Sequence, residues 1–395
     1  MSASAPTDPP DGPDLDLGGD ERAVTAVTSL TEPAEPLDEL GFYTLAGHTS
    51  TPRSTLQEAR DGERLGLGSA FISERFNVKD APTLSGAVAA VTERIGIATA
   101  ATNHTTRHLL VTATFGATMH ALSHGRFSLG LGRGFDALFD VMGAPRVTSA
   151  NLTDAMEILR TLWRDESVIG HDGPAGKFPY LHQGAGLDGT VPILLTAIGP
   201  KTLELGGRTA DAVVLHTFFA DDTLERAVAS VRKGAEEAGR DPASVRIWSV
   251  LATVGDHLDE EARLRKLVGR MATYLQGYGD LMVRVNGWDP DVLARFRAAP
   301  AVTSARGAID ATATPAELEV IAELIPDEWL AASARGTAEE CAATVVDQFR
   351  LGADSVILHG ATPAELAPVV EAYRLVRPAD DVVGRCTANP GWFSA

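Results

Sequence analysis

The sequence predicts an α/β protein, a closed (β/α)8 barrel (TIM barrel) with insertion regions. Eight short apolar segments of strand length recur along the chain, and helical patterns separate nearly all of them. The 395 residues exceed the roughly 250 residues of such a barrel and leave room for insertions. Since barrel loops carry function where the strands end, we expect the site at the carboxyl ends of the strands.

The first two strands are expected at Phe42–Ala46 and Ser69–Ser73. Thr51 and Pro52 supply a cap and a first-turn proline for the helix between them. The second strand runs directly into Glu74 and Arg75. Adjacent charges usually form a surface ion pair worth under about 1 kcal/mol, but this place after a buried strand favours an acid or base beside an anion contact.

The third and fourth strands are expected at Ile95–Thr99 and Phe127–Leu131, on either side of one amphipathic helix. Small polar residues follow both strands, and the second cluster, Gly132-Arg133-Gly134, is rich in glycine. Such glycines are equally consistent with a tight turn and with close approach of the backbone to a flat ring or phosphate.

The remaining strands are expected at Pro192–Ala197, Ala212–Thr217, Arg246–Val254 and Ser355–His359. After the first of these, Gly199-Pro200-Lys201 opens a helix, and the free amides and the lysine favour an anion site over an ordinary turn with a solvated lysine. A GxGxxG match at 184–189 precedes a strand instead of following one, so it is not a dinucleotide-binding motif.

The chain divides into three parts. Residues 1–38 are acidic and rich in proline, which predicts a disordered tail. Residues 39–378 form the barrel, with a mostly helical insertion at about 257–330 and an irregular excursion at 165–190. Residues 379–395 are expected to form a loose C-terminal tail.

Composition excludes several classes of function. With 34 basic and 53 acidic residues the formal charge is −19, so nucleic acid and anionic membrane surfaces are not expected as partners. No apolar run has the length of a membrane span. Cys341 and Cys386 lack a CxxC partner or neighbouring histidine, and the histidines form no HxH or HExxH motif, so no metal is expected. These features predict a cytoplasmic protein.

Four segments carry a resemblance to a known family: GFYTLAG at 41, LGLGSAFISERF at 65, ERIGIATAATNHTTRHLLVTATFGATMHALSHGRFSLGLGRG at 93 and ILLTAIGPKTLELGGRTADAVVLH at 193. Over residues 40–378 the chain resembles the luciferase-like monooxygenase superfamily, and within it the oxidoreductases that depend on the deazaflavin coenzyme F420. The resemblance implies a barrel that binds F420, or alternatively FMN, at its C-terminal mouth.

The resemblance also implies roles for individual residues. The third-strand bulge, which in the family often carries a non-prolyl cis peptide under the ring, would be Thr99, Ala100, Ala101, Thr102 and Asn103. The residues implied near the rest of the cofactor are Gly132, Arg133, Gly134, Ala197, Ile198, Gly199, Lys201 and His216.

The second strand departs from the family pattern. F420 enzymes commonly show Ser-Asp-His there, whereas this chain has Ser73-Glu74-Arg75. Glu74 is therefore the candidate for proton transfer and Arg75 for polarisation of substrate or cofactor. The histidines His48, His104 and His216 are the fallback acids, although a lone histidine at a strand end is more often a structural residue.

The expected function is hydride transfer between F420 and a small organic substrate. One alternative is an FMN-dependent monooxygenase that uses reduced flavin and oxygen with a flavin reductase as partner. A second alternative is a barrel that binds flavin or deazaflavin without catalysis. A homodimer is implied by the resemblance alone.

Overall fold

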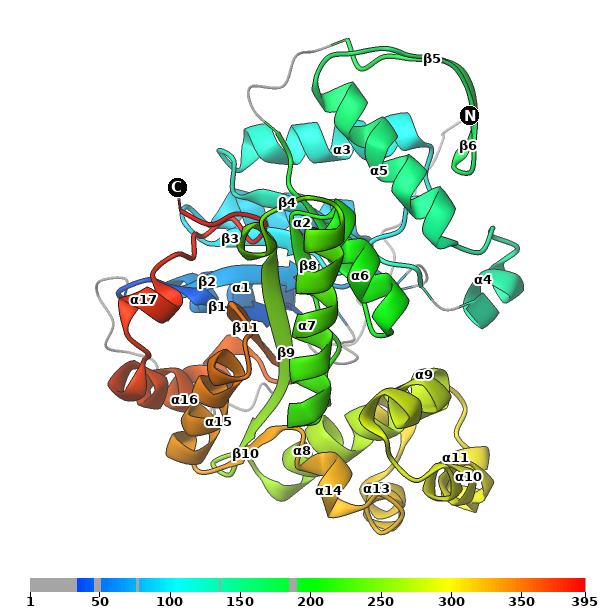
Figure 1. Ribbon diagram of the computed structural model, residues 1–395. Helices are drawn as coiled ribbons and strands as arrows, with labels where there is room; N and C mark the ends of the chain where they lie inside the picture. The colour runs from blue at the N-terminus through cyan, green and yellow to red at the C-terminus, as the bar shows by residue number, and fades with distance from the viewer. Residues whose placement is uncertain (1–33, 46–50, 76–77, 135, 185–189, 395) are drawn as a thin grey trace, which may run out of the picture. The chain divides into compact units, whose positions relative to one another are not determined.

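Eight parallel strands close into a barrel in the computed structural model, which describes residues 34–45, 51–75, 78–134, 136–184 and 190–394. In chain order, which is also their spatial order, the strands are β1 (Leu37–Tyr43), β2 (Leu67–Ile72), β3 (Gly96–Thr99), β4 (Phe127–Leu131), β7 (Ile193–Thr196), β8 (Ala212–Val214), β9 (Arg246–Gly255) and β11 (Ser355–His359) (Figure 1). Pairing of β8 with β9 and of β11 with β1 closes the ring. The predicted (β/α)8 fold is confirmed.

Helices cover the outside of the barrel, and their boundaries follow local capping chemistry. In the capping box at Thr337, the hydroxyl accepts a hydrogen bond from the Glu340 amide at 3.2 Å and the Glu340 carboxylate accepts one from the Thr337 amide at 2.8 Å. The covering helices are α1 (Ser54–Arg64), α2 (Ala81–Val91), α3 (Leu109–Leu122), α5 (Ser149–Trp163), α6 (Pro200–Thr209), α7 (Asp221–Glu237), α15 (Ala338–Arg350) and α16 (Pro363–Val376). The short α4 (Asp136–Met142) is mostly exposed and begins at the cavity.

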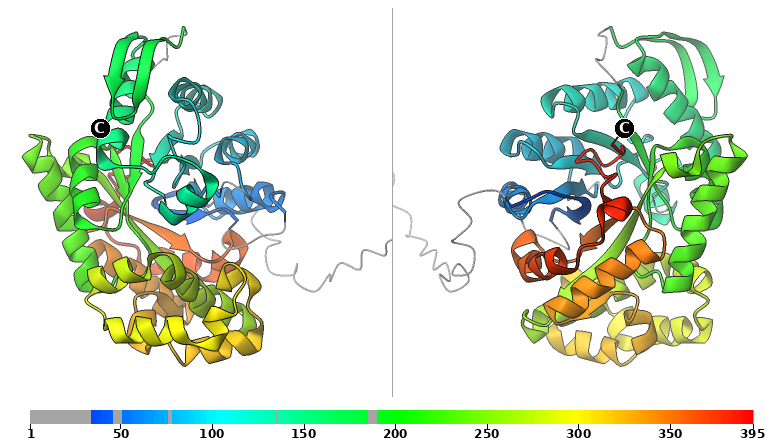
Figure 2. Two further views of the ribbon diagram at one scale, coloured as in Figure 1. Left: turned by 90° about the vertical axis from the view of Figure 1, so that its right-hand side faces the viewer. Right: turned by 60° about the vertical axis from the view of Figure 1, so that its left-hand side comes forward.

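The insertion after β9 is helical, as predicted, and has its own hydrophobic core. Met271, Leu275 and Phe296 are buried in it, and the rings of Trp288 and Trp329 stack 4.5 Å apart. It contains α8 (Glu260–Leu264), a π-helical turn (Arg265–Gly269), α9 (Arg270–Asn286), α10 (Pro290–Ala298), α11 (Pro300–Thr303), α12 (Ile309–Thr312), α13 (Pro315–Ala322) and α14 (Asp327–Leu330), before β10 (Ala334–Gly336) pairs with β9. Figures 1 and 2 show this yellow and orange group at the lower end of the barrel.

Three boundaries differ from the sequence prediction. β1 begins at Leu37, which is buried, so the barrel starts before the expected Phe42 and takes in the end of the expected tail. Residues 1–33 lie outside the described residues. The excursion at 165–190 contains an antiparallel hairpin, β5 (Val168–Gly173) and β6 (Gly176–Leu181), most of whose side chains are exposed or half-buried, so it lacks the apolar alternation that predicts strands.

The expectation of a loose C-terminal tail is wrong for the described residues. After α17 (Asp380–Val383), the chain packs across the amino ends of the strands. The guanidinium of Arg246, fully buried at the start of β9, donates to the carbonyl oxygens of Thr387, Asn389 and Trp392 at 2.8, 3.0 and 3.1 Å. It also donates to the carbonyl of Asp38 at 2.7 Å and therefore ties both ends of the described chain to the barrel.

We predict that Arg246→Met lowers the free energy of unfolding by about 3 kcal/mol or more, because four carbonyl groups around this fully buried guanidinium lose a charged donor. Arg385→Met is the matched control, since this exposed arginine lies over the ring of Phe393 in the same segment. Urea denaturation gives the free energy of unfolding of both variants. If Arg246→Met loses no more of this free energy than Arg385→Met, the assigned role of Arg246 is contradicted.

Candidate active site

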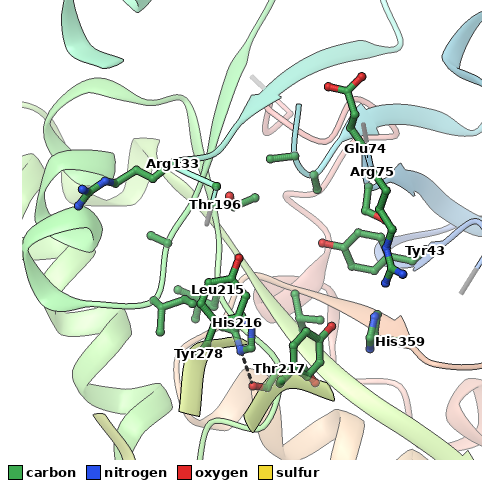
Figure 3. Close-up of a pocket in the computed structure, with 18 of the residues that line it drawn as sticks. Tyr43, Glu74, Arg75, Arg133, Thr196, Leu215, His216, Thr217, Tyr278 and His359 are labelled. Carbon is green, nitrogen blue, oxygen red and sulfur yellow. Dashed lines mark hydrogen bonds between the residues drawn. The ribbon is translucent and has the colours of Figure 1, made fainter. Parts of the chain in front are cut away.

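A cavity of about 650 Å³ opens at the carboxyl ends of the strands, on the edge that the sequence predicted. Seven of the barrel strands contribute residues at or just beyond their ends, and helix α9 of the insertion covers one side. The residues used below are Tyr43, Glu74, Arg75, Lys79, Ala100, Ala101, Arg133, Ile198, Gly199, His216, Arg270, Tyr274, Tyr278 and His359 (Figure 3).

The segment after β3 that was expected to form a bulge contains a non-prolyl cis peptide between Ala100 and Ala101. The amide of Ala100 donates to the carbonyl of Ile72 on β2 at 2.8 Å, and that of Thr102 donates to the carbonyl of Gly130 on β4 at 2.9 Å. The bulge is therefore held from both neighbouring strands. Ala100 and Ala101 line the cavity and give it a floor of small side chains.

Four residues expected to contact the cofactor lie in the wall behind this floor. They are Thr99, Thr102, Asn103 and Gly132, none of which lines the cavity. The Thr99 hydroxyl and Asn103 amide donate to the carbonyls of Gly130 and Gly132, at 2.8 and 3.3 Å, so both side chains fix the bulge against β4. These residues therefore support the bulge, and their direct contact with a cofactor stays a prediction that the cavity lining does not favour.

The glycines within and just after β4 allow close approach of the protein's own segments. A Cβ on Gly130 would lie 1.7 Å from the Thr99 carbonyl oxygen, and one on Gly132 would lie 2.9 Å from Ala101 Cβ. Gly134 has a φ of +70°, which favours glycine in the turn that follows. The tight-turn interpretation therefore applies at Gly134, and close approach of these glycines to a ring or phosphate stays a prediction.

The Glu74 carboxylate is engaged away from the cavity. It accepts hydrogen bonds from the guanidinium of Arg107 and from the Thr102 hydroxyl at 2.5 Å, and its side chain is 2% exposed. Figure 3 shows the carboxylate directed away from Arg75, whose guanidinium points into the cavity. This geometry favours a positioning role for Glu74, because its oxygen atoms hold the loop after β3 in place.

The histidines expected to be fallback acids have different surroundings. His216 lines the cavity, and its Nδ1 lies 2.9 Å from the Thr217 carbonyl oxygen. His104 is buried outside the cavity, with neither ring nitrogen hydrogen-bonded among the described residues. Burial lowers the pKa of each of these histidines to about 4. His48 lies outside the described residues.

The start of α6 borders the cavity through Ile198, Gly199 and Thr202. Lys201 is exposed and does not line the cavity, so its expected contact with the cofactor is not supported. Because consecutive side chains of a helix point about 100° apart, Thr202 faces the cavity and Lys201 does not. Ala197 also lines the cavity, and Arg133 borders it from β4 while its Nε donates to the Val147 carbonyl at 3.1 Å.

The sequence did not identify a group of aromatic and charged residues in the wall. His359, at the end of β11, meets the ring of Tyr43 edge-on at a centroid distance of 5.1 Å, and His216 meets Tyr274 at 4.7 Å. Tyr43 is the last residue of β1 and lies in one of the segments that carry the family resemblance, so its position offered a signal. Arg270 and Tyr274 come from the insertion, whose sequence has no motif that points to the barrel.

Two properties expected from the sequence concern metals and membranes. Across the described ranges, no three His, Cys, Asp or Glu side chains gather in a way that would bind a metal ion. In the same part of the chain, no helix combines the length and the hydropathy needed to cross a bilayer.

Comparison with known proteins gives a family match and several relatives. The sequence model of the family described as luciferase-like monooxygenase matches residues 38–355. The 5,10-methylenetetrahydromethanopterin reductase of Methanolobus tindarius is 29% identical over 303 residues, which are 76% of this chain and 87% of the reductase. A phthiodiolone/phenolphthiodiolone dimycocerosates ketoreductase of Mycobacterium tuberculosis is 30% identical over 53% of this chain and 57% of its own length.

Two solved structures share the fold. The coenzyme F420-dependent tetrahydromethanopterin reductase from Methanopyrus kandleri aligns with a TM-score of 0.73 and 20% identity, over 87% of this chain and all of the reductase. An F420-dependent secondary alcohol dehydrogenase bound to an F420–acetone adduct aligns with a TM-score of 0.64 and 20% identity, again over 87% of this chain and all of the dehydrogenase. At this identity the two likenesses establish the barrel architecture.

We predict that His104 makes stability depend on pH. Its pKa is near 4 when folded and near 6.5 when unfolded, so the unfolded state binds more protons between these values. The stabilisation is present above pH 6.5 and is lost as the pH falls toward 4, by up to about 3 kcal/mol. Across this pH range, the free energy of unfolding of His104→Leu should fall less steeply than that of the wild type. The variant of an exposed histidine, His257→Gln, should follow the wild type. Equal slopes for all three proteins would refute the prediction.

Proposed function

The chain belongs to the luciferase-like monooxygenase family, and on that premise we propose that it is an F420-dependent oxidoreductase that transfers a hydride between F420 and a small organic substrate. The observation that carries the proposal is the cavity above the Ala100–Ala101 bulge, in a chain similar to a methylenetetrahydromethanopterin reductase. Two F420-dependent enzymes with the same fold support the choice of cofactor.

The residues present fit a flat ring joined to an anionic arm. Ala100 and Ala101 offer a floor without bulky side chains under the ring. A Cβ on Gly199 would have a single neighbour, 3.8 Å away, so this wall leaves room for a ligand beside the N-terminus of α6. Backbone amides at that helix end and the guanidinium of Arg133 would bind the phosphate of the arm.

F420 supplies the hydride chemistry when bound, and the protein contributes position and proton transfer. The Nδ1 proton of His216 donates to the Thr217 carbonyl, which leaves Nε2 as the acceptor nitrogen of a neutral ring. The lowered pKa of His216 keeps the ring uncharged at neutral pH. We assign to His216 the exchange of a proton with the substrate oxygen or nitrogen.

Glu74 and Arg75 have different roles in this proposal: Glu74 positions the loop after β3, and Arg75 contacts the ligand. The buried ion pair between Glu74 and Arg107, with the hydrogen bond from Thr102, holds the loop that carries the bulge. Arg75 points into the cavity and would meet the ligand directly. Glu74 is therefore a positioning residue in this proposal.

The FMN-dependent monooxygenase with a flavin reductase partner is the alternative that the family description favours. A barrel that binds the cofactor without turnover is the second alternative. The homodimer and the cytoplasmic location remain predictions of the sequence. Preference for F420 or FMN distinguishes the proposed oxidoreductase from the monooxygenase. Turnover distinguishes both enzymes from the barrel that binds a cofactor without catalysis.

We expect the purified protein to bind F420 at least about tenfold more tightly than FMN, because the anionic arm and the flat ring both find partners in the cavity. Calorimetric titration of both ligands in one buffer measures this preference. The opposite preference would place the protein among the FMN monooxygenases, and binding of neither ligand would refute the proposed site.

We predict that His216→Gln lowers kcat about 100-fold, the scale of a lost general acid or base, while the Kd for F420 changes little. His171→Gln is the control, since this histidine contacts Asp154 beside the hairpin, outside the cavity. Steady-state kinetics with any accepted substrate, together with F420 titration, checks both values. An unchanged kcat would remove His216 from proton transfer.

A further inference from the structure

We propose that the substrate carries an anionic group, a carboxylate or a phosphate, that binds to the cationic side chains of Arg75, Lys79 and Arg270. This inference rests on the proposed function, because it gives the cofactor the opposite part of the same cavity. The three residues come from the end of β2, the turn before α2 and the first position of α9. All three line the cavity.

These cations are close together and largely withdrawn from water. Lys79 is 6% exposed and Arg270 is 4% exposed. Burial, with Arg75 and Arg270 as neighbouring charges, lowers the pKa of Lys79 to about 8, and burial beside Arg270 lowers the pKa of Arg75. Like charges in a poorly hydrated site repel one another, so an anion bound among them would be stabilising.

One nearby carboxylate, Asp310, pairs with Arg270, so three cations and one paired carboxylate leave this part of the cavity with a net positive charge. Asp310 lies 3.3 Å from the Arg270 guanidinium and accepts the hydroxyl of Thr273, and it does not line the cavity. Glu58, also outside the lining, accepts the Leu45 amide at 2.6 Å, and burial raises its pKa toward the neutral form. Glu74 lines the cavity, but its carboxylate is held by Arg107.

Unused hydrogen-bonding capacity at the same place indicates a ligand. Arg270 Nε and His359 Nδ1 are buried and have no hydrogen-bond partner among the described residues. Among the described residues, Lys79 Nζ donates two long bonds, to the Leu45 carbonyl at 3.3 Å and to the Ser73 hydroxyl at 3.2 Å. An anionic oxygen would accept from such donors in charge-assisted hydrogen bonds, which are among the strongest in proteins.

Aromatic rings beside the cations indicate the rest of the substrate. Tyr43, Tyr274 and Tyr278 line the cavity, and Tyr43 and Tyr274 both pack near His359. These surfaces suit a planar or apolar body, with the anionic group at one end. The inferred ligand class is an organic acid or a phosphate ester whose reacting carbon lies between the cations and the bulge.

The position of this cluster separates it from the surface assigned to the cofactor arm. Figure 3 shows Arg75, Tyr43 and His359 on one side of the cavity and Arg133 and Thr196 on the other. The two cationic regions therefore belong to different strands, β2 and the insertion on one side and β4 on the other. A single anionic arm that lies along β4 and α6 leaves the Lys79 side open for the substrate.

The test is calorimetric binding of inorganic phosphate and of benzoate to the full chain, at constant ionic strength set by chloride, with and without saturating F420. We expect at least one anion to bind in both conditions. Lys79→Met should weaken that binding about tenfold or more, while the Kd for F420 stays as in wild type. Lys233→Met, which alters an exposed lysine on α7 that pairs with Glu204 of α6, should bind the anion like wild type.

The outcomes distinguish this inference from the proposed function. Absence of anion binding to the wild type, or equal affinity in Lys79→Met, overturns the anionic subsite and leaves the F420 proposal standing. Loss of anion binding when F420 is saturating overturns the substrate assignment, because the cluster would then hold the cofactor's own anionic arm. Anion binding without any F420 binding refutes the proposed function. If Lys79→Met does not fold, Arg75→Gln serves as the second variant under the same criteria.

Discussion

The hydrogen bonds that hold the chain between β2 and β4 just after β3 are the constraint on which the site depends. They fix the Ala100–Ala101 bulge from both sides, through the Ile72 and Gly130 carbonyls. Gly130 makes this possible, since a Cβ there would overlap the Thr99 carbonyl. The small residues of the bulge then form the floor, and every other group in the cavity takes its position relative to that floor.

Charge is distributed unevenly around this floor. The acidic residue nearest the bulge, Glu74, is committed to Arg107, so its charge stabilises the loop instead of the cavity. Arg75, the next residue along the chain, faces the opposite way and joins Lys79 and Arg270 at the cavity wall. An acidic protein with a net charge of −19 thus keeps a local cationic pocket, which is the arrangement expected for selective capture of an anionic ligand.

The barrel was predictable because each strand is a short apolar segment, whereas features that depend on distant partners were not. The C-terminal segment has an unremarkable sequence, and it is ordered by carbonyl groups that Arg246 binds from more than a hundred residues away. The polar clusters at strand ends located the cavity correctly. The direction of each side chain did not follow from the sequence. The Glu74 carboxylate was expected to face the cavity but is held by Arg107, and Lys201 was expected at the wall but does not line it. Arg270 was missed because the fold of the insertion decides its place.

The central claim is that a deazaflavin ring lies on the Ala100–Ala101 floor. A crystal structure of the protein with bound F420 tests it most directly. The account predicts the ring above these two alanines, the phosphate arm toward Gly199 and Arg133, and open space beside Lys79. An F420 molecule bound with its phosphate among Arg75, Lys79 and Arg270, or outside this cavity, would contradict it.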